Sequence, residues 1–285
     1  MRFAPRQCSP PLESPTVATA HMPDEFFALI VHHLPPEQPV GPTGGRPRVR
    51  HRVAVRVIWF VLATGNRWED VPRELGCSGR TAHRRLRAWE EAGVWDRLHA
   101  DLLRLLRRAD KLDADVAIVD GVMVRAFGGG ENTGPSPVDR RKPGTKHTLL
   151  VDRHGVPLAV RTAGANASDH RQILPLVALD FPRVGGKPGR PKERPDVLYA
   201  DRGYDSDATR LVLRWLGVEP RIARRRAEHG SGLGKVRWVV ERTISWIKGL
   251  RRMRVRYDRL GVIRDAFTTL AASVVCFRIL HDGVL

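Results

Sequence analysis

Three acidic residues occupy positions at which carboxylates can do chemistry. Asp120 follows an apolar run in AIVDG, Asp201 follows another in LYADRGYDSD, and Glu241 lies within KVRWVVERTISWIKGL. Taken singly, each has an ordinary structural explanation: a turn at Asp120, a loop cap at Asp201 and an i, i+4 ion pair at Glu241. Taken together, two carboxylates at strand ends and one on a helix can form an oxygen cage for Mg²⁺.

Such a cage supports phosphodiester displacement. Two metal ions about 3.5–4 Å apart can activate a water molecule and stabilise the leaving oxygen. The His and Cys residues show no zinc-ligand spacing, which favours a hard, oxygen-bound metal. We therefore expect two Mg²⁺ ions as cofactors, with Mn²⁺ able to substitute.

The helix expected around Glu241 carries cations on the same face. Arg237, Glu241 and Lys248 follow one another at i, i+4 and i+11. The opposite side is apolar and predicts core packing; it comprises Val236, Val239, Val240, Ile247 and Leu250. The polar face suits a metal-bound carboxylate flanked by cations that contact DNA phosphates. The alternative is a face that only meets solvent.

The elements that would position these residues alternate along the chain. Strands are expected at 115–119, 148–151, 157–161, 196–200 and 220–223, and helices at 169–179, 206–216, 234–250 and 262–281. The segments 148–151 and 157–161 flank the turn DRHG and predict a hairpin. This order predicts an α/β fold with a mixed sheet flanked by helices.

The N-terminal region is expected to be all-helical. Its helices are predicted at 24–34, 51–64, 68–75, 79–91 and 97–110. A helix, a turn and a second, arginine-bearing helix resemble a helix-turn-helix. The candidate DNA-contacting residues on that helix are Arg80, Arg84, Arg85 and Arg87. The alternative is a solvated basic face on an ordinary helical domain.

The overall charge points to nucleic acid. The 285 residues include 49 Lys and Arg against 31 Asp and Glu, a formal net charge of +18. Such a surface suits phosphate neutralisation with counterion release. Basic clusters after a strand and after the Glu241 helix add candidate DNA contacts, namely Arg224, Arg225, Arg251 and Arg252.

Other classes of protein are disfavoured. No apolar run reaches the roughly 18–20 residues of a membrane span, and the N-terminus lacks the apolar stretch of a secretory signal. Three widely spaced cysteines fit a reducing cytoplasm. We expect a disordered tail at 1–21, a helical DNA-binding domain at 22–110 and a catalytic domain at 111–285, with Met22 as an alternative start.

The motifs resemble a known family. AIVDG, GTKHTLLVDRHGVPLAV, ANASDH, ADRGYDSD and VVERTISWIKGLRRMRVRYDRL are similar, in this order, to segments of DDE-class bacterial insertion-sequence transposases, family five in particular. The family's signature is Tyr-x2-Arg-x3-Glu-x6-Lys, and Arg237, Glu241 and Lys248 match its last three positions. Gly234 stands where the family has Tyr, so the resemblance departs from the signature at its first position.

The resemblance implies a ribonuclease-H-like core in which Asp120, Asp201 and Glu241 are the catalytic metal ligands. Arg237 and Lys248 would hold DNA near the scissile phosphate. The implied reaction is Mg²⁺-dependent nicking at terminal inverted repeats, followed by strand transfer without a covalent protein–DNA intermediate. The expected partners are double-stranded DNA and a second copy of the chain, with no membrane, in a bacterial cytoplasm at the nucleoid.

Two rival functions remain open at this point. One is a transposase-derived DNA-binding regulator that has lost catalysis. The other is a different metal-dependent nuclease with the same fold, such as a resolvase.

Overall fold

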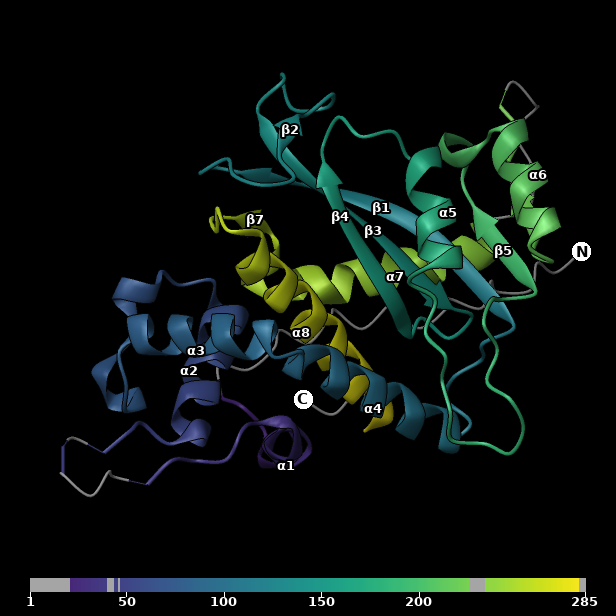
Figure 1. Cartoon of the computed structure of the whole chain (residues 1–285). Helices are drawn as coiled ribbons and strands as arrows, with labels where there is room; N and C mark the ends of the chain where they lie inside the picture. The colour runs from purple at the N-terminus through teal and green to yellow at the C-terminus, as the bar shows by residue number, and fades with distance from the viewer. Residues whose placement is uncertain (1–20, 40–43, 46, 226–233, 282–285) are drawn as a thin grey trace, which may run out of the picture.

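The N-terminal third of the chain is helical, as predicted (Figure 1). The computed structural model describes residues 21–39, 44–45, 47–225 and 234–281. Apart from His21, the tail predicted at 1–21 lies outside these residues. The helices are α1 (Asp24–Ile30), α2 (His51–Thr64), α3 (Gly79–Glu91) and α4 (Val94–Arg108). α1 is followed by a 3₁₀ turn, η1 (Val31–His33).

The helix predicted at 68–75 is not one helix. It consists of two 3₁₀ turns, η2 (Trp68–Asp70) and η3 (Arg73–Leu75). Pro72 separates them because proline lacks an N–H and disfavours a helical conformation in the residue before it. The next helix, α3, starts where expected, with the Ser78 hydroxyl accepting a hydrogen bond from the Thr81 N–H at 3.3 Å.

The second part of the chain forms one mixed sheet. Its strands are β1 (Val116–Ala126), β2 (Gly134–Pro135), β3 (Pro143–Asp152), β4 (Pro157–Gly164), β5 (Val197–Ala200), β6 (Glu219–Ile222) and β7 (Val255–Arg256). β3 pairs antiparallel with β1 and β4, whereas β5 and β6 run parallel to β1. The main strands therefore lie in the order β4-β3-β1-β5-β6. This arrangement confirms the predicted ribonuclease-H-like mixed sheet.

The neighbours of β1 change along its length. β3 pairs with one edge of β1 continuously from Ala117 to Arg125. On the other edge, β5 pairs with residues 116–118 and β7 with residues 125–126. Within the described residues, no strand pairs with residues 119–124 on that second edge. The sheet therefore has a gap beside the middle of β1.

Helices cover the sheet and connect it to the helical region. They are α5 (His170–Ala178), α6 (Asp207–Trp215), α7 (Gly234–Gly249) and α8 (Gly261–Leu280). α7 packs against β1 and β3, while α8 packs against β4 and also against α3 and α4 (Figure 1). Trp68 of the helical region stacks on Phe267 of α8, with ring centroids 5.8 Å apart. One continuous apolar core thus joins both regions.

None of the helices in the described ranges combines the length and apolar character needed to cross a bilayer. The division of the chain at residues 110 and 111 stays a prediction, since α8 from the C-terminal end packs against both regions.

Candidate active site

Asp120 lies within a strand rather than at its end, which corrects the sequence-based prediction of a strand at 115–119. β1 continues to Ala126 because β3 supplies backbone hydrogen-bond partners along the whole of this segment. The parallel pairing with β5 stops at Ile118, opposite Tyr199. Continued by two residues, this register would set Asp120 level with Asp201, and the two carboxylates are close enough to interact electrostatically.

The two carboxylates lie at the gap in the sheet. Asp120 lies in the unpaired stretch of β1, and Asp201 directly follows the last residue of β5, Ala200. Ligands of α/β sheets commonly bind at the carboxyl ends of parallel strands. The structure therefore brings together two of the three predicted metal ligands.

The surroundings of Asp120 are partly buried and include both signs of charge. Its Oδ1 accepts a hydrogen bond from the Gly121 N–H at 2.8 Å, and its Oδ2 lies 3.2 Å from Nη2 of Arg237. Burial raises the pKa of Asp120 above its ordinary value, and Asp201 acts in the same direction. The Gly121 N–H and Arg237 oppose this rise in pKa. Proximity to Asp201 therefore has an electrostatic cost that a bound cation would remove.

The loop after Asp201 is held by hydrogen bonds. Asp201 caps a 3₁₀ turn, η4 (Arg202–Tyr204), and accepts from the Gly203 N–H at 2.8 Å. Arg225 donates to the carbonyl oxygens of Arg202 and Gly203, both at 3.0 Å. The position of Asp201 is therefore fixed by its own loop and not only by β5.

Glu241 is exposed and lies one helical turn after Arg237 on α7. Since Arg237 contacts Asp120, the face of α7 that carries Glu241 is turned toward the carboxylate pair. Among the residues that the structure describes, no three His, Cys, Asp or Glu side chains are close enough to hold a metal ion. Asp120 and Asp201 have the oxygen donors that a hard cation prefers, whereas Glu241 lies apart from them.

Sequence reasoning missed two residues beside this pair. Tyr204 is 2% exposed, and its Oη has no hydrogen-bond partner within the described ranges. A Cβ placed on Gly121 would lie 3.2 Å from this Oη and 3.9 Å from Oδ1 of Asp169. Asp169 in turn forms an ion pair with the buried Lys146, whose Nζ is 2.6 Å from its Oδ1. Asp169 lies within the motif ANASDH and Tyr204 within ADRGYDSD, so the family motifs could have identified both residues.

The four arginines of α3 differ in exposure and in ion pairing. Arg80 and Arg84 are exposed, whereas Arg85 is half-buried with its guanidinium 6.0 Å from the Trp89 ring. Arg87 is exposed but paired with Glu91 at 2.8 Å. The structure therefore leaves Arg80 and Arg84 exposed for the predicted DNA contact.

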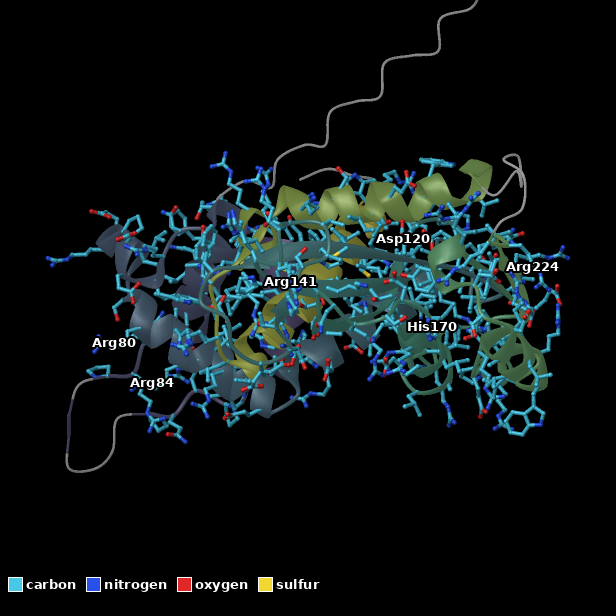
Figure 2. The ribbon with its side chains drawn as sticks, turned by 90° about the horizontal axis from the view of Figure 1, so that it is seen from above. Arg80, Arg84, Asp120, Arg141, His170 and Arg224 are labelled. Atoms are coloured by element: carbon cyan, nitrogen blue, oxygen red, sulfur yellow. The ribbon has the colours of Figure 1, made fainter. Side chains whose placement is uncertain are left out.

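Three further predicted DNA contacts lie outside α3, each in a different part of the structure. Arg224 is exposed and paired with Asp207 at 2.9 Å, while Lys248 and Arg251 are exposed on α7 and in the turn after it. Figure 2 shows Arg80 and Arg84 at one end of the molecule, Arg224 at the other, and Asp120 between them. The predicted DNA contacts thus extend over the length of the molecule and not over one small patch.

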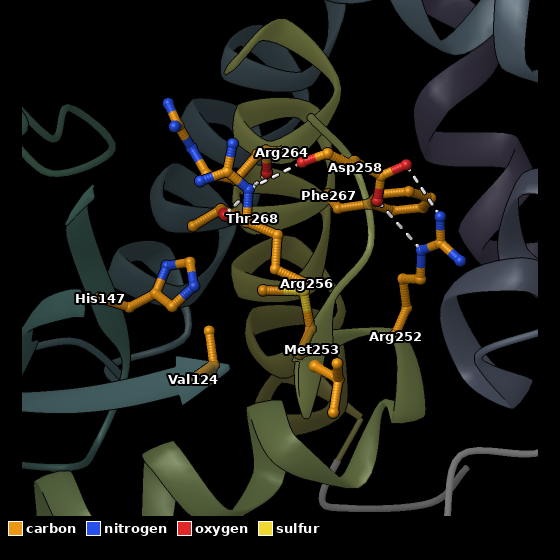
Figure 3. Close-up of a pocket in the computed structure, with 10 residues that line it drawn as sticks. Val124, His147, Arg252, Met253, Arg256, Asp258, Arg264, Phe267 and Thr268 are labelled. Carbon is orange, nitrogen blue, oxygen red and sulfur yellow. Dashed lines mark hydrogen bonds and ion pairs between the residues drawn. The ribbon is translucent and has the colours of Figure 1, made fainter. Parts of the chain in front are cut away.

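Arg252 is in the interior, which corrects its prediction as a DNA contact. It is 5% exposed and makes two hydrogen bonds to the Asp258 carboxylate, at 2.8 and 3.2 Å (Figure 3). It also donates to the carbonyl oxygen of Asn66 at 3.2 Å and lies 5.5 Å from the Phe267 ring. Arg252 therefore joins the turn after α7 to the helical region and to α8. The sequence could not separate it from its exposed neighbour Arg251.

Comparison with known proteins gives matches along most of the chain. Residues 22–99 match the family described as putative transposase of the IS4/5 family, and residues 111–276 match the transposase DDE domain. A putative transposase for insertion sequence element IS402 from Burkholderia cepacia is 50% identical over 153 residues, which cover 54% of this chain and 72% of that protein.

Two further similarities concern shorter or more distant proteins. An uncharacterized 16.2 kDa protein of insertion element IS402, also from Burkholderia cepacia, is 49% identical over 122 residues, or 42% of this chain and 83% of that protein. Among solved structures, the Mos1 strand transfer complex is 12% identical with a TM-score of 0.35, covering 84% of this chain and 77% of that chain. Because the DDE-domain match alone covers more than half of the sequence, this chain belongs to the DDE transposases, in their IS4/5 group.

Proposed function

We propose that this protein binds the terminal inverted repeats of an insertion sequence and catalyses Mg²⁺-dependent strand cleavage followed by strand transfer. The observation that carries the proposal is the proximity of Asp120 on β1 to Asp201 directly after β5, at the gap in the sheet. The Arg237 contact, which turns the Glu241 face of α7 toward this pair, supports the same conclusion.

The catalytic metal ligands in this proposal are Asp120, Asp201 and Glu241. When bound, two Mg²⁺ ions would act as Lewis acids that activate the attacking oxygen and stabilise the leaving oxygen. Asp120 and Asp201 supply carboxylate oxygens from fixed backbone positions. Glu241, exposed on α7, would supply the third carboxylate.

The cations beside the carboxylates have distinct roles in the proposal. Arg237 and Lys248 lie on the face of α7 that includes Glu241, and they bind phosphates on either side of the bond that is cut. Tyr204 does not act as a covalent nucleophile, because it is buried and its pKa is raised by burial and by nearby carboxylates. The phosphodiester exchange therefore proceeds by direct attack of water and then of the freed 3′-hydroxyl.

DNA recognition is assigned to the helical region at 22–110 and catalysis to residues 111–285. Arg80 and Arg84 contact the element end, and Arg224, Arg225 and Arg251 contact the DNA backbone elsewhere. We place the active form as a homodimer, because two element ends must be joined in one event. Its place of action is the bacterial cytoplasm at the nucleoid.

The test is cleavage of DNA that carries the inverted repeats found beside the gene. The wild type is compared with Glu241→Gln, and with Glu219→Gln as a control that changes an exposed carboxylate on β6. We expect cleavage in Mg²⁺ by the wild type and the control, and none by Glu241→Gln or in EDTA. Cleavage by Glu241→Gln would show that the active site has been assigned wrongly.

A second candidate function is a DNA-binding regulator without catalysis. The observation that favours it is the ion pair between Arg237 and Asp120, which occupies one of the proposed metal ligands. Specific binding to the inverted repeats by a wild-type protein that never cuts them in Mg²⁺ or Mn²⁺ would select this alternative.

A further inference from the structure

An exposed pair of aromatic rings lies where β1 ends. Phe127 and Tyr257 stack with ring centroids 5.9 Å apart and an interplanar angle of 10°. Phe127 is 60% exposed and Tyr257 is 51% exposed. Burial of aromatic rings lowers the free energy, so an exposed stacked pair is a candidate contact surface.

The pair is held in place by the backbone. β1 pairs with β7 through Arg125 and Ala126, and the Phe127 N–H donates to the carbonyl oxygen of Arg256 at 3.1 Å. Arg256 is buried, and its guanidinium donates to the hydroxyl groups of Thr133 and Thr145 at 3.0 and 2.8 Å. On its inner side, Tyr257 lies 5.5 Å from the buried Arg252 guanidinium. Binding to these two rings therefore requires little ordering of the chain.

Two arginines lie beside the pair. The Arg125 guanidinium lies 4.6 Å from the Phe127 ring centroid, and its Nε is 3.9 Å from the Asp139 carboxylate, a long ion pair. Arg259 is exposed, and its side chain packs against Gly128. Aromatic rings interleaved with arginines are the combination that binds unpaired bases and their phosphates. An acidic or purely apolar protein partner would use only one half of this surface.

The pair also lies between the two regions expected to meet DNA. Through Arg252 it adjoins Asn66 of the helical region, and along β1 it is seven residues from Asp120, about 23 Å at 3.3 Å per residue. That length corresponds to about seven base pairs of B-DNA. DNA that extends from α3 to the carboxylate pair would pass this surface.

We propose that Phe127, Tyr257, Arg125 and Arg259 bind an unpaired base of the element-end DNA. The base stacks on the Phe127 ring, and the Arg125 guanidinium moves from that ring to the adjacent phosphate. Base stacking is the stronger of the two interactions with an exposed ring, which favours this exchange. This inference rests on the proposed function, since it requires the element end as ligand.

The test measures equilibrium binding in EDTA, so that no strand is cut. The probes are element-end duplexes that are fully paired, or that carry one unpaired thymine at each of roughly the first ten positions in turn. We expect the wild type to bind one of the unpaired probes about tenfold more tightly than the paired duplex. Phe127→Ala and Phe127→Leu should lose this preference, because neither side chain offers an aromatic face.

Trp215→Ala is the matched control, since Trp215 is 82% exposed on α6 and should not affect the preference. Tyr257→Ala should weaken the preference, and far-ultraviolet circular dichroism checks that each variant is folded. Equal binding of all probes by the wild type, or an unchanged preference in Phe127→Ala, would overturn the inference. A Phe127→Ala protein that sediments differently from the wild type but binds DNA equally well would also overturn it, because this result would indicate a protein contact instead. A wild type that binds the ends without cutting them contradicts the proposed function alone.

Discussion

Arg237 of α7 and Asp120 of β1 form an ion pair, with Nη2 and Oδ2 3.2 Å apart, although they are 117 residues apart in the chain. Both side chains are mostly buried, at 21% and 18% exposed. Arg237, which is expected to bind the scissile phosphate, thus contacts Asp120, which is expected to bind the metal ion. The guanidinium partly neutralises Asp120 and would compete with a metal ion for this carboxylate.

The first prediction concerns this competition. Arg237→Gln should bind Mn²⁺ several-fold more tightly than the wild type in the absence of DNA, because the guanidinium no longer shares Asp120. Isothermal titration calorimetry measures the affinity. The control is Arg221→Gln, which changes an exposed arginine on β6. An identical Mn²⁺ affinity in Arg237→Gln and the wild type would show that the ion pair does not compete.

The second prediction concerns Asp169, which we place as a positioning residue beside the carboxylate pair. Asp169→Asn should slow cleavage by roughly 10–100-fold, because it removes the charge partner of buried Lys146 next to Gly121. The affinity for element-end DNA should stay the same. Asp180→Asn is the control, since Asp180 pairs with Arg161 elsewhere. A cleavage rate equal to that of the control would remove Asp169 from the site.

The third prediction separates two neighbouring arginines. Arg252→Ala should lower the free energy of unfolding by about 3–5 kcal/mol, because it leaves the largely buried Asp258 carboxylate without its partner. Arg251→Ala should leave stability nearly unchanged and reduce the salt dependence of DNA binding by about 0.9 in slope. Urea denaturation and binding titrations at several salt concentrations check both. A stable Arg252→Ala protein would contradict the interior placement.

The fourth prediction concerns stability at low pH. Burial, together with Arg264 and Arg256, lowers the pKa of His147 from 6.5 to about 4. The folded state therefore binds fewer protons than the unfolded state between these values, and stability falls as pH falls from 6.5 toward 4. The loss attributable to His147 is about 3 kcal/mol.

The measurement for His147 is the free energy of unfolding of wild type and His147→Gln across this pH range. The wild type should lose stability relative to His147→Gln, whereas His281→Gln, which changes an exposed histidine, should follow the wild type. Parallel pH curves for the wild type and His147→Gln would contradict the prediction.

The fifth prediction concerns specificity. Changing Arg80 and Arg84 together to Ala should reduce the preference for element-end DNA over unrelated DNA, by about 1–3 kcal/mol for each lost base contact. Arg87→Ala should have a smaller effect, since Arg87 is already paired with Glu91. Competition binding with the two DNAs checks this. Equal weakening on both DNAs would assign these arginines to the backbone instead.

Local pattern was sufficient for most elements. The bounds of α2 and α3 agree with the helical periodicity and with the stop and cap residues Gly65 and Ser78. These signals are carried by residues that are neighbours in the chain, so they can be read without the fold. The family motifs likewise identified Asp120, Asp201 and Glu241 as candidates before any geometry was known.

The extent of β1, the burial of side chains and the ion pairs of the site depend on segments that are distant in the chain. The sequence alone established the basic charge, the order of elements and the candidate carboxylates. Only the tertiary structure determined that β1 extends past Asp120, since β3 pairs with that stretch, and that Asp201 lies near enough to raise the pKa of Asp120. It also separated buried Arg252 from exposed Arg251, and it placed Arg237 on Asp120. Strand register, burial and ion pairing between distant segments depend on packing, which residue spacing along one strand or helix does not encode.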